Sequence, residues 1–275
     1  GAMGLRQVYP RSMVDERSPR GISTTYSLAR RSTGEKVLLV RGDAEGFEGE
    51  PVVLDGGSTL VCSLTAANAR ELRARLPWLQ PVPLGLQPSA GCGDRLGSAT
   101  PGHIRAIRAV GGIAPILAQQ SMRENARTGR TPQQVMDDAM WGVFEEGWRD
   151  PWGADADHLK TTADIDLCVA AGYTFYTIDP GDHVDNAAHT DELVVLREKF
   201  NVLPWQRLHD YPDAMRARYL SSWGKPGGAG EVLALAFDEM SLLRAACKYG
   251  KALGHTAAMY EHLVVAKGGE PFELE

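Results

Sequence analysis

From about residue 81 the chain alternates short apolar segments with segments that carry helix signals. Strands are expected at residues 82–86, 113–118, 154–159 and 173–178. The helices between them are expected to start at Thr100-Pro101, at the capping box Thr131–Gln134 and at Thr161 or Thr162. Such alternation is typical of a parallel sheet with crossover helices. The sequence therefore predicts an α/β protein with a TIM-barrel-like (β/α)8 fold; an open doubly wound sheet is the alternative.

The predicted barrel has too few strands. About five can be counted, and the last one begins near Pro271. A complete (β/α)8 barrel has eight. The barrel is therefore expected to be incomplete, so that the missing C-terminal half comes from elsewhere or the chain is a fragment of a longer protein. Beyond Asn186 the chain is expected to be mostly helical, with helices at residues 191–200, 213–223 and about 238–266.

Residues 4–80 have a different pattern, which predicts a small β-rich N-terminal lobe. Strand-like segments at residues 22–28 and 36–40 flank a turn, and those at 51–54 and 59–64 flank a second one. A helix is expected at residues 66–76, ended by Pro77. We expect two domains, the lobe at 4–80 and a partial (β/α) barrel at 81–275, with the lobe acting as a cap or as the surface of a homo-oligomer.

Composition narrows the classes of partner. The net charge is -6 and no basic run occurs, so nucleic acid is not expected to bind. No apolar run approaches the length of about 20 residues that a membrane span needs. The 4 cysteines are scattered and form no CxxC pair, which fits a reducing cytoplasm. A cytoplasmic protein is therefore expected; Gly1-Ala2-Met3, which resembles a cleavage scar, is left out of the fold prediction.

Polar side chains gather after the predicted strands, where barrel enzymes place their active sites. In strand order these are Asp94 and Arg95; Gln119, Gln120, Arg123 and Glu124; Asp155, Asp157, His158 and Lys160; Asp179, Asp182, His183 and Asp185; and Glu273 and Glu275 in the fifth strand. The opposite ends of the strands carry few such groups. This edge is therefore expected to hold the active site.

Each candidate also has a structural interpretation. His158 beside Asp157 suits a divalent metal site, but a histidine can equally be hydrogen-bonded at a strand end. His183 either serves the site or lies in a loop held by Asx turns. Arg95 either pairs with Asp94 or clamps a carboxylate or phosphate of a ligand. Lys160, likewise, either binds an anionic substrate or is a solvated loop residue.

Several short segments, taken together and in one order, resemble the tagaturonate/fructuronate epimerase family. They are GDRLG at 93–97, ATPGHIR at 99–105, AQQS at 118–121, RTGRTP at 127–132, GW at 147–148, GADADHLK at 153–160, TIDPGDHVDN at 177–186 and KYGKA at 248–252. The resemblance runs from about Gly85 to the end and weakens in the N-terminal lobe. Members of the family are longer, so the chain resembles the N-terminal part of one.

The resemblance implies a metal-dependent hexuronate epimerase that interconverts D-tagaturonate and D-fructuronate by inversion at C4. Asp157 would be the proton acceptor, His158 a ligand of a divalent metal cation, and Glu273 or Glu275 the proton donor. Residues expected on the side of the keto-uronate substrate are Asp94, Arg95, Gln120, Lys160, Asp179, Asp182, His183 and Asp185. Further metal-ligand histidines of the family lie beyond this chain, which puts its metal affinity and its activity in question.

Two other functions remain open at this stage. One is a different metal-dependent sugar isomerase or aldolase on the same barrel. The other is a non-catalytic carbohydrate-binding remnant that keeps the fold without turnover.

Overall fold

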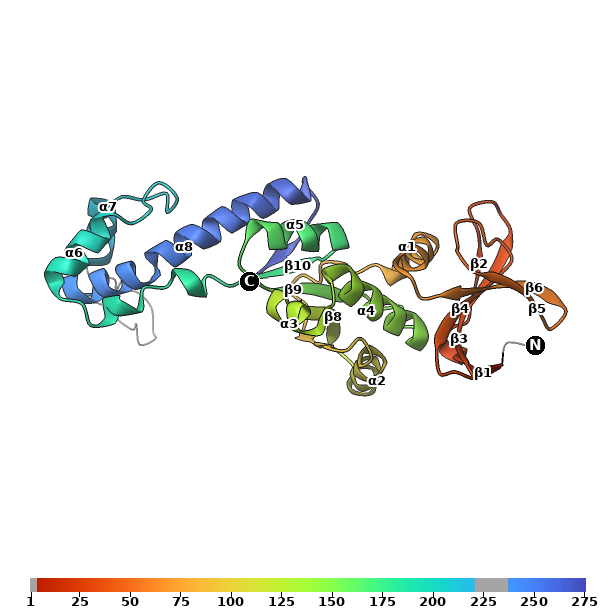
Figure 1. The fold of residues 1–275 in the computed structure, drawn as a ribbon. Coiled ribbons are helices and arrows are strands. Elements are labelled where there is room, and N and C mark those ends of the chain that lie inside the picture. The colour runs from red at the N-terminus through yellow and green to blue at the C-terminus, as the bar shows by residue number, and fades with distance from the viewer. Residues whose placement is uncertain (1–3, 221–236) are drawn as a thin grey trace, which may run out of the picture. The chain divides into compact units, whose positions relative to one another are not determined.

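The computed structural model describes residues 4–220 and 237–275 and shows a mixed α/β protein with two separate sheets (Figure 1). The chain divides into two compact units. The first runs up to Leu159 and includes Ala163–Thr177 and Glu270–Glu275; the second comprises Lys160–Thr162 and the described part of Ile178–Gly269. The domain division at residue 80 stays a prediction. None of the described helices combines the length and the apolar character needed to cross a membrane.

The N-terminal lobe is an antiparallel sheet in the order β1-β3-β4-β6-β5, with β2 paired to β3. Its strands are β1 (Leu5–Val8), β2 (Val14–Arg17), β3 (Ser23–Arg31), β4 (Lys36–Arg41), β5 (Glu50–Leu54) and β6 (Gly57–Ser63). Both predicted hairpins are confirmed, because β3 pairs with β4 and β5 with β6. Ala29, Val37 and Val61 pack together from three neighbouring strands in one buried cluster. The predicted β-rich lobe is thus present.

The second sheet lies in the same unit and has the order β11-β10-β9-β8-β7. Its strands are β7 (Ser89–Gly91), β8 (Ala114–Ser121), β9 (Gly153–Leu159), β10 (Phe175–Ile178) and β11 (Glu273–Leu274). The pairs β7–β8, β8–β9 and β10–β11 are parallel, as strand–helix alternation predicts. The helices of this region are α2 (Thr100–Val110), α3 (Met122–Thr128), α4 (Pro132–Glu146) and α5 (Thr162–Ala171).

The predicted strand at residues 82–86 is wrong. This segment has no strand structure, and the first strand of the sheet is β7, a few residues further along the chain. Pro81, Pro83 and Pro88 remove backbone donors around the segment. The N–H groups of Leu84 and Gly85 donate instead to the side chain of Glu273, 3.0 and 2.6 Å away. The segment is therefore apolar enough for a strand, but it lacks free backbone N–H groups with which to pair with a neighbouring strand.

Ion pairs attach the N-terminal lobe to α4. Arg73 of α1 (Ala66–Arg75) lies 2.7 Å from Asp137, and Arg11 lies 2.7 Å from Glu146. Glu146 also binds Arg105 and Arg108 of α2 at 2.5 and 3.2 Å. Because α4 contacts β8 as well, it links the lobe to the parallel sheet. The capping box predicted at its start is present on Thr131 and Gln134.

The second unit is helical, as predicted. Its helices are α6 (Leu193–Asn201), α7 (Pro212–Leu220) and α8 (Glu239–Lys267), with the 3-10 turns η3 (Gly181–His183) and η4 (Asn186–His189). Asp238 caps α8 and Gly268 ends it in the left-handed conformation, so both predicted ends are confirmed. The last residues of the predicted helix 213–223 lie outside the described residues. Leu196, Phe200, Leu203, Leu243 and Cys247 form the buried core of this unit.

Candidate functional site

Three neighbouring strands bring together Gln119, Asp155 and Thr177. Gln119 and Thr177 lie near the carboxyl ends of β8 and β10, and Asp155 is the third residue of β9. Gln119 Nε2 donates to Asp155 Oδ2 at 2.9 Å, and Thr177 Oγ1 donates to Asp155 Oδ1 at 3.0 Å. Gln119 and Asp155 are direct partners in the β8–β9 register. Asp155 is 3% exposed, whereas Gln119 and Thr177 are only partly buried. These three side chains, here called the polar row, form a continuous hydrogen-bonded layer across β8, β9 and β10.

The carboxyl group of Asp155 lies in an unfavourable setting for a charge. Its pKa is raised to about 6, chiefly by burial and also by the nearby carboxylates of Asp157 and Glu275. The hydrogen bonds from Gln119 and Thr177 favour the charged form and oppose this shift. A carboxyl group with a pKa in this range can hold or release a proton near neutral pH.

Asp157 and His158 form a pair just beyond the polar row on β9. His158 Nδ1 lies 2.6 Å from Asp157 Oδ1, and His158 has a φ of 56°. A carboxylate at Nδ1 favours the imidazole tautomer whose lone pair is on Nε2. An imidazole oriented in this way is the usual arrangement of a metal-ligating histidine with its supporting carboxylate. The His158 side chain is 57% exposed, so its Nε2 can be reached from outside.

The donor set for a metal is incomplete within the described part of the chain. There, no group of three or more His, Cys, Asp or Glu side chains is arranged to hold a metal ion. Protein metal sites generally supply three or four ligands. His158 therefore fits as one oriented ligand, and the described residues add no second and third ligand beside it.

The loop after β7 is organised by Asp94. Its two carboxylate oxygens accept hydrogen bonds from the backbone N–H groups of residues 96 to 100, at 2.7 to 3.2 Å. These bonds hold the pKa of Asp94 below its usual value despite partial burial. The neighbouring Arg95 pairs with Glu124, not with Asp94, and its side chain is 70% exposed. Of the two, Arg95 alone presents its charged end to solvent.

Gln120, the other candidate near β8, faces away from the polar row. It is 3% exposed and accepts a hydrogen bond from Arg130 Nη1 at 3.3 Å. Arg130 also donates to the backbone carbonyl of Asp94 at 2.7 Å and pairs with Asp138 at 2.6 Å. The placement of Gln120 is that of a residue which fixes the Asp94 loop through Arg130; its contact with substrate stays a prediction.

The two glutamates in and after β11 differ in their surroundings. Both carboxylate oxygens of Glu273 accept backbone N–H groups, from Leu84 and Gly85. Glu275 lies at the edge of the polar row, because its carboxylate is among the charges that raise the pKa of Asp155. Of the two predicted proton donors, Glu275 is thus the one near the other candidate groups.

The remaining predicted residues lie in the second unit. Lys160 Nζ lies 2.9 Å from Asp182 and 3.7 Å from Asp179, and the His183 ring stacks on His255 with 3.9 Å between centroids. Asp185 pairs with Lys199 at 2.7 Å, and this pair lowers the pKa of Asp185. Lys160, Asp179, Asp182 and His183 therefore form one cluster, which also includes His255.

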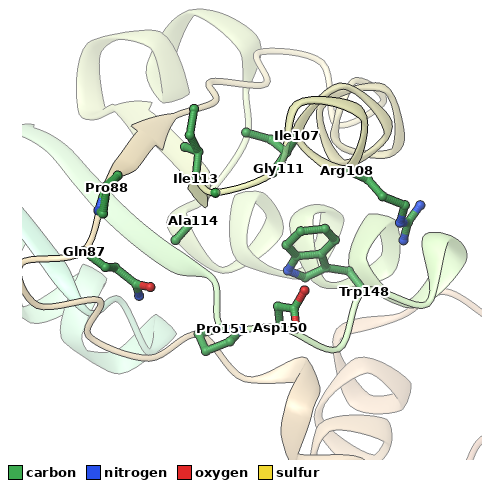
Figure 2. A pocket seen from close by; sticks show the side chains of 11 residues that line it. Gln87, Pro88, Ile107, Arg108, Gly111, Ile113, Ala114, Trp148, Asp150 and Pro151 are labelled. Atoms are coloured by element: carbon green, nitrogen blue, oxygen red, sulfur yellow. The ribbon is translucent and has the colours of Figure 1, made fainter.

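A pocket of about 430 Å³ lies at the opposite end of the parallel strands from the polar row. Figure 2 shows it between the end of α2 and the start of β8, with Trp148, Arg108 and Asp150 around it. Its β8 residue is Ala114, the first of the strand, whereas Gln119 lies near the other end. Barrel enzymes use the carboxyl ends of their strands, so this pocket is separate from the candidate site.

The sequence prediction placed Gln119 and Asp155 at the active-site edge without giving them a role, and it did not select Thr177. A usable signal exists, because side chains alternate between the faces of a strand. Asp155 and Asp157 share one face of β9, and the strand register then assigns Gln119 rather than Gln120 to that face. The register itself cannot be read from the sequence alone.

Comparisons with known proteins agree with this picture. A family model described as tagaturonate epimerase matches residues 16–275. A tagaturonate/fructuronate epimerase of Thermotoga maritima is 40% identical over 245 residues, which are 88% of this chain and 48% of that protein. The native crystal structure of fructuronate-tagaturonate epimerase UxaE from Cohnella laeviribosi matches with a TM-score of 0.81 at 32% identity, over 98% of this chain and 51% of that one. A glycerol complex of the same protein matches with a TM-score of 0.80.

The chain thus spans about half the length of the relatives that it matches. The identity to the Thermotoga protein extends over nearly the whole of the chain, as does the family match. The chain belongs to the tagaturonate epimerase family.

Proposed function

We propose that this chain carries the Asp157–His158 part of an active site that interconverts D-tagaturonate and D-fructuronate by inversion at C4. The observation that carries the proposal is the oriented pair of Asp157 and His158 beside the buried acidic polar row, at the carboxyl edge of a parallel sheet. Asp157 would act as the base. A cytoplasmic location and the absence of a nucleic-acid partner stay predictions.

The inverted carbon is β to the ketone, so its hydrogen is not acidified by the carbonyl group. Asp157 could instead take the proton of the C4 hydroxyl. The C3–C4 bond would then break, its electrons would move toward the ketone, and C4 would become an aldehyde. Rotation of the aldehyde and re-formation of the bond would invert C4. The other route, removal and return of the C4 hydrogen, needs a different way to acidify it.

A divalent metal cation fits this proposal through His158, as one ligand. When bound, such an ion would stabilise negative charge on the ketone oxygen. The exposed guanidinium of Arg95, which Glu124 orients, would hold the carboxylate of the substrate. Glu275 would return a proton, since it is the glutamate nearer to the polar row.

We also propose that the parallel sheet is part of a (β/α)8 barrel. The described sheet has β7 and β11 at its two ends, and the relatives are about twice as long as this chain. The remaining strands would come from the rest of a family chain or from a separate polypeptide. If so, a whole site would need both parts.

The test is conversion of D-tagaturonate to D-fructuronate, followed by NMR, with and without added Mn²⁺ or Zn²⁺. The assay uses this chain alone and this chain mixed with a polypeptide that covers the remaining half of the Thermotoga relative. We expect metal-dependent turnover in the mixture, lost on His158→Ala and on Asp157→Asn. His209→Ala is the matched control, because His209 is exposed and also has a positive φ, 49°. Turnover that survives His158→Ala would refute the metal role.

A substrate screen separates the proposal from the other functions. Neutral ketoses and phosphorylated sugars should not turn over in the same mixture. Turnover of these in place of the keto-uronates would indicate another isomerase or aldolase. Sugar binding without any turnover or metal uptake would indicate a non-catalytic module.

A further inference from the structure

The amide group of Gln119 is held by one hydrogen bond and by close packing against β7. Its Nε2 donates to Asp155 Oδ2 at 2.9 Å, which settles which end of the amide is nitrogen and which is oxygen. The amide lies directly over Gly91 on β7, where an added Cβ atom would come within 2.8 Å of Gln119 Cδ. Real Cβ atoms do not approach so closely, so this placement of Gln119 depends on a glycine at position 91.

The orientation of Gln119 turns its Oε1 toward β7, where this oxygen is the atom nearest to a Cβ added at Gly91. Gln119 lies on the same strand face as Ser121, which is the register partner of Asp157. Unlike its neighbour Gln120, Gln119 is only partly buried. The polar row therefore carries a fixed, partly exposed amide on the same face of the sheet as Asp157.

The presence of a carboxylate at the buried position 155 is not explained by the stability of the fold. An asparagine could pair with Gln119 and Thr177 without a charge that burial disfavours. A carboxylate has one advantage over asparagine here: it only accepts, so Gln119 must turn its nitrogen toward Asp155 and its oxygen away. Asparagine would permit either orientation of the Gln119 amide.

We propose that Gln119 contacts the substrate through Oε1, accepting a hydrogen bond from a hydroxyl group of the keto-uronate, and that Asp155 and Gly91 are positioning residues for its amide. This inference rests on the proposed function. The chemistry selects the hydroxyl, because the ketone and the carboxylate of a keto-uronate are acceptors and cannot donate to Oε1. The carboxylates of Asp155, Asp157 and Glu275 repel the carboxylate end of the substrate from this part of the site. The polar row thereby orients the sugar chain.

Binding of D-fructuronate and D-tagaturonate tests the inference without need of turnover. Dissociation constants are measured by isothermal titration calorimetry at pH 7.5, with this chain mixed with the polypeptide that covers the remaining half of the Thermotoga relative. The melting temperature of every variant is recorded. We expect Gln119→Met to weaken binding at least about tenfold, as the loss of a ligand hydrogen bond does. Asp155→Asn is expected to weaken binding by a smaller factor with no fall in melting temperature. Gln7→Met, an exposed glutamine of β1, is the matched control and should bind as the unmodified chain does.

Gly91→Ala tests the positioning role separately, since it displaces the amide without removing it. We expect it to weaken binding about as much as Gln119→Met does. The double variant should bind no worse than Gln119→Met alone, because both changes remove one contact. If Gly91→Ala does not fold, Asp155→Asn and Gln119→Met still decide the question.

Three results would count against the inference or the function, and they differ. Normal binding by Gln119→Met, with binding lost on Asp157→Asn, overturns the inference and leaves the proposed function intact. Weak binding by Gln120→Met together with normal binding by Gln119→Met assigns the substrate contact to Gln120 and also overturns the inference. No binding of either keto-uronate by the mixture with the unmodified chain contradicts the proposed function, and the inference with it.

Discussion

His158 turns back onto the residue directly before it, so that its Nδ1 lies 2.6 Å from Asp157 Oδ1. Adjacent side chains of an extended strand point to opposite faces. The left-handed backbone of His158, with a φ of 56°, removes this separation and lets both groups face one side. Such a conformation costs a residue with a side chain roughly 1–3 kcal/mol. The residue with this conformation, His158, lies near the end of β9 and directly follows the candidate base Asp157.

The strain at His158 gives a prediction that separates stability from metal binding. Glycine adopts a positive φ without steric cost, so His158→Gly should leave the free energy of unfolding unchanged or raise it by up to about 1 kcal/mol. Affinity for Mn²⁺ or Zn²⁺ should fall at least about tenfold. Urea unfolding and calorimetry measure the two quantities. His209→Gly, with a starting φ of 49°, is the control: it should match the change in stability and leave metal affinity unchanged. Equal metal affinity in both variants would exclude His158 as a ligand.

Asp155 is predicted to cost stability at neutral pH. Its pKa is raised from 3.8 to about 6 in the folded chain, so the folded state holds the proton more tightly than the unfolded state does. The resulting stabilisation is present below about pH 4 and is lost as pH rises through 6. Asp155→Asn should therefore be more stable than the unmodified chain at pH 7.5, by about 1–3 kcal/mol. Urea unfolding at pH 4.5, 6.0 and 7.5 checks this. A loss of stability at pH 7.5 would contradict the burial argument.

The sequence predicts the helix ends better than the strand register. Caps such as Thr131 and Asp238 act on their own next few residues, so local chemistry is enough to place them. The helix α3 was missed, although Ser121 and Glu124 form a capping box that is visible in the sequence. The wrong strand prediction at residues 82–86 came from the apolar content of the segment, which does not reveal the acceptors of its backbone N–H groups. That depends on Glu273, almost 190 residues away.

Only the part of the candidate site that is local in the sequence could be predicted from the sequence. The adjacency of Asp157 and His158 is visible in the sequence, and the family resemblance adds their roles. The polar row is not visible, because Gln119, Asp155 and Thr177 meet only through the pairing of three strands. Glu273 and Glu275, two residues apart, also have different partners that only the fold reveals.

Asp94 is predicted to be essential for the loop that carries Arg95. Asp94→Asn would turn one acceptor oxygen into a donor, which would face N–H groups of the loop. We expect a loss of about 2–3 kcal/mol in unfolding free energy, as for hydrogen bonds to a charged group. Because the pKa of Asp94 is lowered in the fold, its contribution is present above about pH 4 and is lost at more acidic pH. Urea unfolding at pH 7.5 and pH 3 measures both effects. Asp55→Asn, whose side chain is 95% exposed, is the control and should change neither.

The stacked rings of His183 and His255 predict a pH dependence in the second unit. Burial lowers the pKa of His255 from 6.5, the neighbouring His183 lowers it further, and a hydrogen bond with the Lys160 backbone raises it. A lowered pKa means that the unfolded chain takes up the proton first. The contribution of His255 to stability is therefore present above pH 6.5 and is lost as pH falls through its lowered folded value. His183→Ala removes the like charge and should raise the pKa of His255, which the NMR titration of its ring protons reports. His209→Ala, in the same unit but outside the stack, should leave that pKa unchanged. A pKa of His255 at or above 6.5 in the unmodified chain, or one that does not respond to His183→Ala, would show that the stack does not couple the two rings.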